Sequence, residues 1–188
     1  MDEKSTVSNT EPRWQISTLI SIASQYDSVL DVGCGTGNIL KRIRSDYRIG
    51  IDACLKVILQ AGRNANDVIF QCRDLLEIDF GAWRMFDFVY GVDIIEHFEK
   101  DVAIDLISKL ESCASKRLVF FIPVGNHPQT RDDRGFNNHI YQTHRSVWHP
   151  KDMEDLGYKV WHYPDWHKNI KPPKEKGAMW CQKIIGEI

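Results

Sequence analysis

The sequence predicts a three-layer α/β domain in which a doubly wound sheet of seven strands, mostly parallel with one antiparallel strand, is flanked by helices. Short apolar runs typical of buried parallel strands alternate with segments of helical periodicity. The first such run, at residues 29–32, leads directly into a turn that contains three glycines. A strand, a glycine turn and a helix in this order are typical of the opening of a sheet that binds a nucleotide beyond its carboxyl edge.

Seven segments have the composition of strands, and the last two determine the direction of the final strand. The fifth segment should end at Pro123, because proline cannot donate a hydrogen bond to a neighbouring strand. The loop at residues 164–177 is rich in proline and lysine and reads as an extended hairpin, so the seventh strand should pair antiparallel with the sixth. The expected strands are residues 29–32, 47–52, 67–72, 86–93, 117–123, 158–162 and 178–185.

Helical periodicity appears between most of these strands. Pro12 suits the first turn of a helix that continues to residue 24. A second helix is expected from residue 38 onward, since Ile39, Leu40 and Ile43 fall on one face. Further helices are expected at residues 55–64, with Val57, Ile58 and Ala61 facing the sheet, and at residues 100–115 and 150–156.

The glycine turn and the acids near it favour a cationic nucleotide ligand. The spacing is G-x-G-x-G, so the dinucleotide fingerprint G-x-G-x-x-G fails at its third glycine. Acids also stand at the expected carboxyl ends of four strands, and they would repel a pyrophosphate. The sulfonium and ammonium charges of S-adenosylmethionine suit such a row. The four acids are Asp31, Asp52, Asp74 and Asp93.

Residues 29–40 resemble the first motif, L-D-x-G-C-G-x-G, of the class I S-adenosylmethionine-dependent methyltransferases. The resemblance implies a Rossmann-like fold, methyltransferase activity and S-adenosylmethionine as the cofactor. It implies that Asp52 holds the ribose hydroxyls, Asp74 accepts from the adenine amino group and the backbone at Leu75 meets the ring. Asp52 and Asp74 could also cap the helices that follow them. The implied cofactor contacts are Asp31, Gly33, Cys34, Gly35, Gly37, Asp52, Asp74, Leu75 and Val92.

Two histidines are candidate general bases, because histidine can take up a proton near neutral pH. His97 closes a D-x-x-E-H segment that resembles the one after the fourth strand of many small-molecule methyltransferases. His144 opens a segment that resembles an H-x-S-x-W stretch of the same family. We favour His144, since His97 could simply brace the next helix, although His144 could also act only by positioning the substrate. Glu96 is expected to be a structural hydrogen-bond partner.

The irregular segment at residues 124–149 is expected to be a lid or substrate loop, because long loops in compact domains are usually functional. Within it, Tyr141, Arg145 and Trp148 are the candidate substrate-binding residues, although the two aromatic residues could simply pack the loop. No metal site is expected. His97, His127, His139 and His144 gather at the same edge, but no H-x-x-x-H or H-x-E spacing accompanies them.

The composition suits one domain over residues 1–188, with a flexible N-terminus at residues 1–11. A formal net charge of -2 argues against a dedicated nucleic-acid binder, although four lysines beside Trp166 in the loop at residues 164–177 leave such a contact open. Five widely spaced cysteines, no signal peptide and no membrane-spanning run predict a cytoplasmic protein. The sequence does not specify an oligomeric state.

The sequence therefore predicts methyl transfer from S-adenosylmethionine to an oxygen of a small-molecule or glycan-intermediate acceptor. N-methylation of a small amine and methylation of RNA remain alternatives within the enzymes. An alternative of a different class is a non-catalytic subunit that binds S-adenosylmethionine and supports a partner. Conversion of the cofactor to S-adenosylhomocysteine would separate the enzymes from that subunit.

Overall fold

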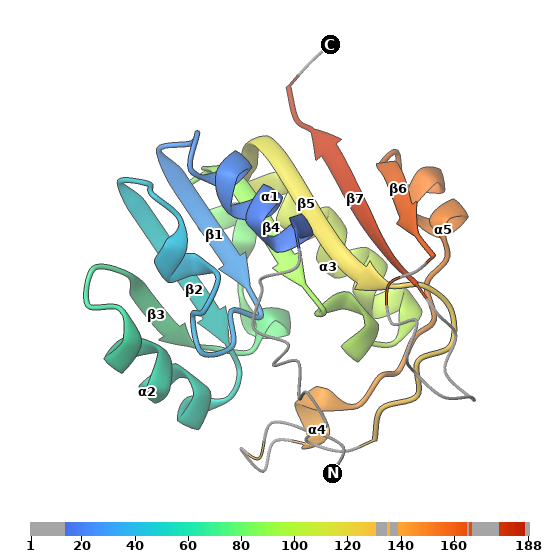
Figure 1. Cartoon of the computed structure of the whole chain (residues 1–188), viewed down its shortest axis with the longest axis horizontal. Coiled ribbons are helices and arrows are strands. Elements are labelled where there is room, and N and C mark those ends of the chain that lie inside the picture. The colour runs from blue at the N-terminus through green and yellow to red at the C-terminus, as the bar shows by residue number, and fades with distance from the viewer. Residues whose placement is uncertain (1–13, 131–134, 136–138, 165, 167–176, 187–188) are drawn as a thin grey trace, which may run out of the picture.

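The seven predicted strands form one sheet in a computed structural model that describes residues 14–130, 135, 139–164, 166 and 177–186 (Figure 1). The strand order is β3-β2-β1-β4-β5-β7-β6. Only β7 runs antiparallel to its neighbours β5 and β6, as predicted. The strands are β1 (Ser28–Val32), β2 (Tyr47–Asp52), β3 (Ile69–Cys72), β4 (Phe86–Val92), β5 (Ala114–Pro123), β6 (Lys159–Tyr163) and β7 (Ala178–Ile184). The predicted fold class is confirmed.

Helices cover both faces of the sheet, with α1 on one side and α3 on the other (Figure 1). The helices are α1 (Trp14–Ala23), α2 (Leu55–Asn64), α3 (Lys100–Cys113), α4 (His139–Gln142) and α5 (Pro150–Asp155). In α2, Val57, Ile58 and Ala61 are buried, as the periodicity predicts. None of the described helices has the length and apolar character that crossing a bilayer requires.

The prediction of a regular helix after the glycine turn is wrong. The segment forms only a 3₁₀ turn at Leu40–Arg42, and Ile43 is already extended. The chain has too little length there, because positive-φ glycines occupy the turn as far as Gly37 and β2 begins at Tyr47. Leu40 and Ile43 are nevertheless buried, so the apolar pattern reflects burial without a regular helix.

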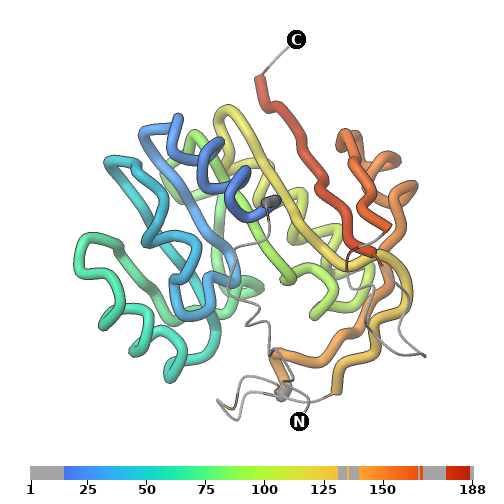
Figure 2. The backbone as a smooth tube through the Cα atoms, viewed as in Figure 1, coloured from blue at the N-terminus to red at the C-terminus, as the bar shows by residue number. Residues whose placement is uncertain are grey.

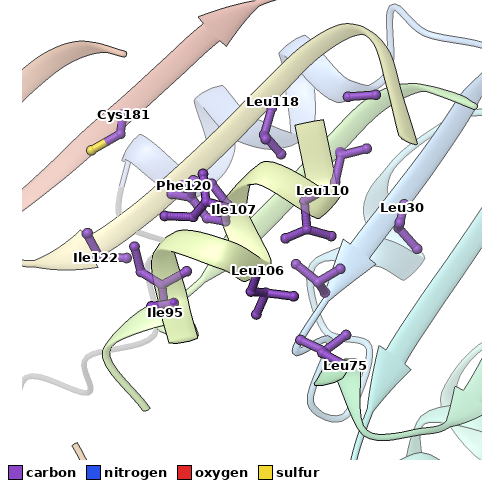
Figure 3. Close-up of a cluster of buried hydrophobic side chains, with 14 of the residues drawn as sticks. Leu30, Leu75, Ile95, Leu106, Ile107, Leu110, Leu118, Phe120, Ile122 and Cys181 are labelled. Atoms are coloured by element: carbon purple, nitrogen blue, oxygen red, sulfur yellow. The ribbon is translucent and has the colours of Figure 1, made fainter. Parts of the chain in front are cut away.

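Side chains of β5 alternate between the two faces, which explains why this strand is apolar throughout. Leu118, Phe120 and Ile122 pack with α3 in the cluster that Figure 3 shows. Val119 and Phe121 pack on the opposite face, with the cluster that includes α1. Because successive residues of a strand point to opposite faces, a strand buried on both sides has no polar alternation. Fully burying each such side chain stabilises the fold by about 1.5–3 kcal/mol.

The chain passes twice along the carboxyl edge of the parallel strands. After β5 it runs past this edge, and it returns to the same edge before α5 (Figure 2). The two passes are joined where the Gly125 amide donates to the Trp148 carbonyl at 2.8 Å. The irregular segment predicted at residues 124–149 therefore lies beside the predicted ligand edge, although residues 131–134 and 136–138 lie outside the described residues.

Candidate active site

A cavity of about 500 Å³ opens at the carboxyl edge of the sheet. Volumes of this size hold small molecules and cofactors. One end is formed by the turns after β1, β2 and β3 and by the end of β4. The other end is formed by the β4–α3 connection, the start of the segment after β5, and residues 140–145. We call the part bordered by the first group of elements the first end of the cavity and the part bordered by the second group the second end.

The turn after β1 is held in a conformation that only glycine accommodates readily. The Gly33 and Cys34 amides both donate to the Ile51 carbonyl of β2, at 2.8 and 2.9 Å. Gly33 has φ +73°, and a Cβ there would lie 2.6 Å from Cδ1 of Ile94. Gly33 thus keeps the floor of the cavity open at the point where Ile94 also reaches it.

Asp52 links the glycine turn to the end of β2. One of its carboxylate oxygens accepts from the Gly35 amide at 3.0 Å, and the other accepts from the Cys54 amide at 2.9 Å. Asp74 similarly accepts from the Leu76 amide at 3.0 Å, so it caps the short turn that follows β3. Both acids line the cavity together with Leu75 and Val92. Capping and cavity exposure therefore coexist at Asp52 and Asp74.

Asp31 differs from the other three predicted acids, because it does not line the cavity. This carboxyl group is 2% exposed and accepts from the Tyr90 hydroxyl at 2.6 Å. Burial raises the pKa of Asp31 to about 7; the Tyr90 hydrogen bond opposes the increase and the charge of Asp52 adds to it. Asp31 lies within β1 and not beyond its end, so its side chain packs beside Tyr90 of β4 and does not reach the carboxyl edge. Of the four predicted acids, Asp52, Asp74 and Asp93 line the cavity.

The other predicted turn residues shape the turn and do not appear among the described residues that line the cavity. Cys34 is buried, and burial raises the pKa of its thiol. Gly35 donates its amide to Asp52. At Gly37, a Cβ would lie 2.6 Å from the Phe70 ring, so this glycine allows β3 to pack against the turn. These three residues support the cofactor end from behind.

His97 and His144 come together at the second end of the cavity, although they lie far apart in the sequence. Their rings meet edge to face with centroids 4.8 Å apart. The His97 Nδ1 lies 3.3 Å from the Thr143 carbonyl, and the His144 amide donates to the Gln129 carbonyl at 2.9 Å. His97 is buried and His144 is partly exposed. The pair lines the part of the cavity away from the glycine turn.

Arg145 fastens the two segments that carry these histidines. Its guanidinium donates to the carbonyls of His97 and Ile140, each at 2.6 Å. Its backbone amide donates to the Glu96 carbonyl at 2.8 Å, and the Ser146 amide donates to the same carbonyl at 3.1 Å. Arg145 also lines the cavity. The structure therefore gives Arg145 a positioning role that the prediction of substrate binding did not include.

Glu96 contradicts the prediction of a structural hydrogen-bond partner. Its side chain is 1% exposed, and within the described part of the chain neither carboxylate oxygen has a hydrogen-bond partner. Burial raises the pKa of Glu96 well above its usual range, and the nearby charge of Asp93 adds to this effect. A buried carboxylate without partners is costly, so it needs a reason to be retained.

The two aromatic candidates for substrate binding separate in the structure. Tyr141 lines the cavity and is 40% exposed. Trp148 is 1% exposed, lies in the core cluster beneath α3 and donates from Nε1 to the Ser146 hydroxyl at 2.9 Å. Trp148 therefore packs the segment onto the sheet and does not form a wall of the cavity.

Several residues of the cavity wall were not among the sequence-predicted site residues. Two of them belong to sequence features that could have indicated the site: Ile94 is inside the D-x-x-E-H segment, and Pro123 ends a predicted strand. His127 was noted only as a possible metal ligand. Gln129 carries no local pattern, because only the return of the chain brings it to the cavity. The additional lining residues include Ile94, Phe98, Val102, Pro123, His127 and Gln129.

A family model described as "Methyltransferase domain" matches residues 29–116, which span β1 to the start of β5 and include the glycine turn, Asp52, Asp74 and Glu96. The matched region, the curated relative and the methyltransferase structures of the same fold support the predicted family, the class I S-adenosylmethionine-dependent methyltransferases. The predicted family and the prediction of an enzyme domain with S-adenosylmethionine as its cofactor are thereby confirmed.

One curated relative is the carboxy-S-adenosyl-L-methionine synthase of Helicobacter pylori (strain P12). It is 26% identical over 87 residues, which cover 42% of this chain and 36% of the relative. The match thus spans about a third of that relative's length.

Solved methyltransferase structures share the fold over nearly the whole chain. The N-methyltransferase NodS from Bradyrhizobium japonicum WM9, in complex with S-adenosyl-L-homocysteine, has a TM-score of 0.67 at 12% identity and covers 95% of this chain and 90% of its own. The magnesium protoporphyrin IX methyltransferase from Synechocystis PCC 6803 has a TM-score of 0.60 at 15% identity, with 92% and 79% covered. At these identities the similarity concerns the fold.

The residues at the first end of the cavity fit the family's cofactor. Gly33 leaves space where any side chain would meet Ile94. Asp52 and Asp74 provide carboxylate acceptors for hydroxyl and amino groups, and Leu75 and Val92 add apolar surface. Acidic residues line the cavity, among them Asp52, Asp74 and Asp93, so the electrostatic environment suits a sulfonium cation. We therefore assign these residues to S-adenosylmethionine as a proposal for the site.

Proposed function

We propose that this methyltransferase transfers a methyl group from S-adenosylmethionine to an oxygen of a small-molecule or glycan-intermediate acceptor. The observation that carries the proposal is one cavity with two ends. The first end holds Gly33, Asp52 and Asp74, which suit the nucleoside, and the second holds His97 and His144. Two reactants placed in one cavity can react without the entropic cost of meeting in solution, which contributes about 7–11 kcal/mol.

Oxygen is the acceptor atom that the second end suits best. When bound, S-adenosylmethionine supplies an electrophilic methyl carbon, whose bond to sulfur breaks as the new carbon–oxygen bond forms. An acceptor hydroxyl must also lose its proton during this transfer. The two imidazoles line the same cavity, which supports a role for one of them in removing that proton, and such assistance is worth about 10²–10⁴-fold in rate. The products are a methyl ether, S-adenosylhomocysteine and a proton.

A small acceptor fits the enclosed second end better than a polymer does. His97 and Glu96 are buried, and Tyr141 and Arg145 border the space beside them. The lysine-rich loop that left a nucleic-acid contact open falls largely at residues 167–176, which lie outside the described residues. All five cysteines are free, which supports the proposed cytoplasmic setting.

Transfer of labelled methyl from S-adenosylmethionine into a fractionated small-molecule extract tests the proposal. We expect label in an acid-stable, base-stable product together with S-adenosylhomocysteine, and much less of both from the Asp52→Ala variant at cofactor concentrations below saturation. Calorimetry should show binding of S-adenosylhomocysteine and no binding of NAD. Binding of S-adenosylhomocysteine without any transfer would instead favour the non-catalytic subunit, and label recovered in RNA or in an amine would favour those acceptors.

A further inference from the structure

Three side chains at the second end of the cavity form a cluster with the composition of a metal site. The ligand atoms of Glu96, His97 and His144 all lie within 4.8 Å of one another. Around a tetrahedral cation with ligands at about 2.0–2.2 Å, the ligand atoms lie about 3.3–3.6 Å from one another. Side-chain movements of less than about an ångström would therefore bring the three groups to coordination distance.

The environment of Glu96 gives a second and independent indication of a ligand. Its carboxylate is buried, lines the cavity, and has no hydrogen-bond partner for either oxygen within the described residues. Buried carboxylates are normally paired, hydrogen-bonded or bound to a metal. The imidazoles of the cluster are the neighbouring donors, so a cation between the three groups would satisfy a carboxylate that is otherwise uncompensated.

The backbone around the cluster is built to hold its geometry. The Glu96 carbonyl accepts from the amides of Arg145 and Ser146, which fixes the segment of His144 against the β4–α3 connection. The Arg145 guanidinium donates to the His97 carbonyl and so joins the two segments a second time. Metal sites depend on such supporting contacts, because these contacts orient the ligands. The three ligands come from two segments that are rigidly joined.

We propose that Glu96, His97 and His144 bind one divalent cation of the zinc type, which faces the acceptor end of the cavity. Two imidazoles and one carboxylate suit Zn²⁺, Co²⁺ or Fe²⁺ better than Mg²⁺ or Ca²⁺, which prefer oxygen ligands. Three protein ligands would leave a position open toward the cavity, where an acceptor oxygen could bind. The role of the cation in activating an acceptor rests on the proposed function, whereas binding of the cation does not.

The cation would change how the acceptor is activated. With His97 and His144 as ligands, neither imidazole serves as the base. A hydroxyl coordinated to the cation loses its proton far more readily, as water does on zinc, so the proton can leave to solvent. The oxygen then attacks the methyl carbon, and the electron pair of the broken bond returns to sulfur. The sequence predicts no metal site, because the H-x-x-x-H and H-x-E spacings place the ligands on one segment, whereas these three ligands come from two.

Binding of Co²⁺ and Zn²⁺ to the full chain tests the site after treatment with a chelator. We expect one Co²⁺ per chain with visible absorption bands that Zn²⁺ displaces. The isosteric Glu96→Gln change and the His144→Gln change should each weaken binding by about 100-fold or more. His162→Gln is the matched control, since this histidine is exposed on β6 and lies outside the cluster.

Each result decides the inference. Absence of stoichiometric Co²⁺, or equal binding by wild type and both cluster variants, would overturn it. Turnover that persists in chelated enzyme and still requires His144 would also overturn it and would identify His144 as the base. Calorimetry with S-adenosylhomocysteine on the chelated protein separates the two proposals, because failure of that binding counts against the proposed function and leaves the cation result valid.

Discussion

Single residues at this carboxyl edge combine a structural and a binding role. Asp52 accepts from two backbone amides and still lines the cavity, because a carboxylate has more lone pairs than two hydrogen bonds use. Asp31, only a few residues from the glycine turn, is instead buried against Tyr90. The difference follows from position: Asp31 lies inside β1, whereas Asp52 is the last residue of β2.

Asp52→Ala should weaken binding of S-adenosylhomocysteine by about 1.5–3 kcal/mol, since charge-assisted hydrogen bonds to the ribose are lost. Isothermal calorimetry measures the effect. The Asp105→Ala variant is the control, because Asp105 pairs with Lys109 on the outer side of α3 and should leave affinity unchanged. A loss of only a few tenths of a kcal/mol would show that Asp52 only accepts hydrogen bonds from the Gly35 and Cys54 amides and does not bind the cofactor.

Asp31→Asn should flatten the pH dependence of stability. The pKa of Asp31 is raised to about 7 in the folded protein from 3.8, chiefly by burial, so its neutral form is favoured there. The resulting stabilisation is present in acid and is lost as pH rises through 7, at up to about 1.4 kcal/mol per pH unit between about pH 4 and 7. Tyr90, Asp52 and Cys34 are the titratable neighbours that face it.

Urea unfolding between pH 5 and 8 measures this dependence. The exposed Asp46→Asn variant serves as the control for a change of one surface charge. The free energy of unfolding of the wild type should fall over this range relative to that of Asp31→Asn. Parallel curves for the two proteins would contradict the account of Asp31.

At the scale of elements, the carboxyl ends of the parallel strands position the whole site. The register places Val32 beside Ile51 and Gly91, so the turns after β1, β2 and β4 begin at the same level. A side chain added in one of these turns would therefore reduce the volume of the cavity that all three turns border. The two passes of the segment after β5 then close the second end of the cavity.

Gly33→Ala should abolish cofactor binding and destabilise the protein. The added Cβ would lie 2.6 Å from Ile94, and φ +73° is strained for alanine. Gly62→Ala is the matched control, because a Cβ there meets nothing within 4 Å and the position is helical. The control should be more stable by roughly 0.5–1 kcal/mol. Thermal unfolding with and without S-adenosylhomocysteine compares the two, and equal ligand shifts would refute the steric argument.

Backbone amides of the His144 segment should exchange slowly with solvent even without ligand. The amides of Arg145 and Ser146 both donate to the Glu96 carbonyl, and the His144 amide donates to Gln129. Arg145→Lys should speed exchange at residues 143–146, because an ammonium group cannot reproduce the two guanidinium contacts. Amides of β1 are the internal control. Fast exchange at residues 144–146 in the wild type would indicate instead that this segment belongs to a moving lid.

At the scale of the whole molecule, two cores on the faces of the sheet hold the edge that carries the site. The cluster on the α3 side extends from β1 through β5 to α5 and includes Trp148, which lies just before α5. Lys100 strengthens this junction, since its ammonium lies 3.7 Å from the centre of the Trp148 ring and 2.9 Å from the Asp152 carboxylate. Val124 and Trp148, at the two ends of the segment between β5 and α5, are thus part of the folded core.

Trp148→Ala should therefore destabilise the protein by about 3–5 kcal/mol, as expected for removal of a fully buried indole. Chemical denaturation measures the change. Trp161→Ala is the control, because Trp161 is 38% exposed on β6 and should cost much less. A cost for Trp148 no larger than that for Trp161, accompanied by loss of acceptor affinity, would restore the interpretation of Trp148 as a cavity wall.

The sequence by itself determined the seven strands of the sheet and identified five residues that line the first end of the cavity, Gly33, Asp52, Asp74, Leu75 and Val92. These features are local: the apolar runs, the glycine turn and the acids at or just beyond the ends of β2, β3 and β4 each belong to one short stretch of chain, and the parallel topology brings the strand ends to one edge. Even there, the short segment after Gly37 was mistaken for a helix, because an apolar period reports burial and does not report whether enough chain remains to form turns.

Only the tertiary structure decided the second end of the cavity. Glu96 and His97 meet His144 because the chain leaves the sheet after β5 and returns, and no spacing within one segment signals that contact. The same return buried Trp148 and turned Arg145 toward backbone carbonyls. Local patterns specify elements, whereas partners distant in sequence are specified by how those elements pack.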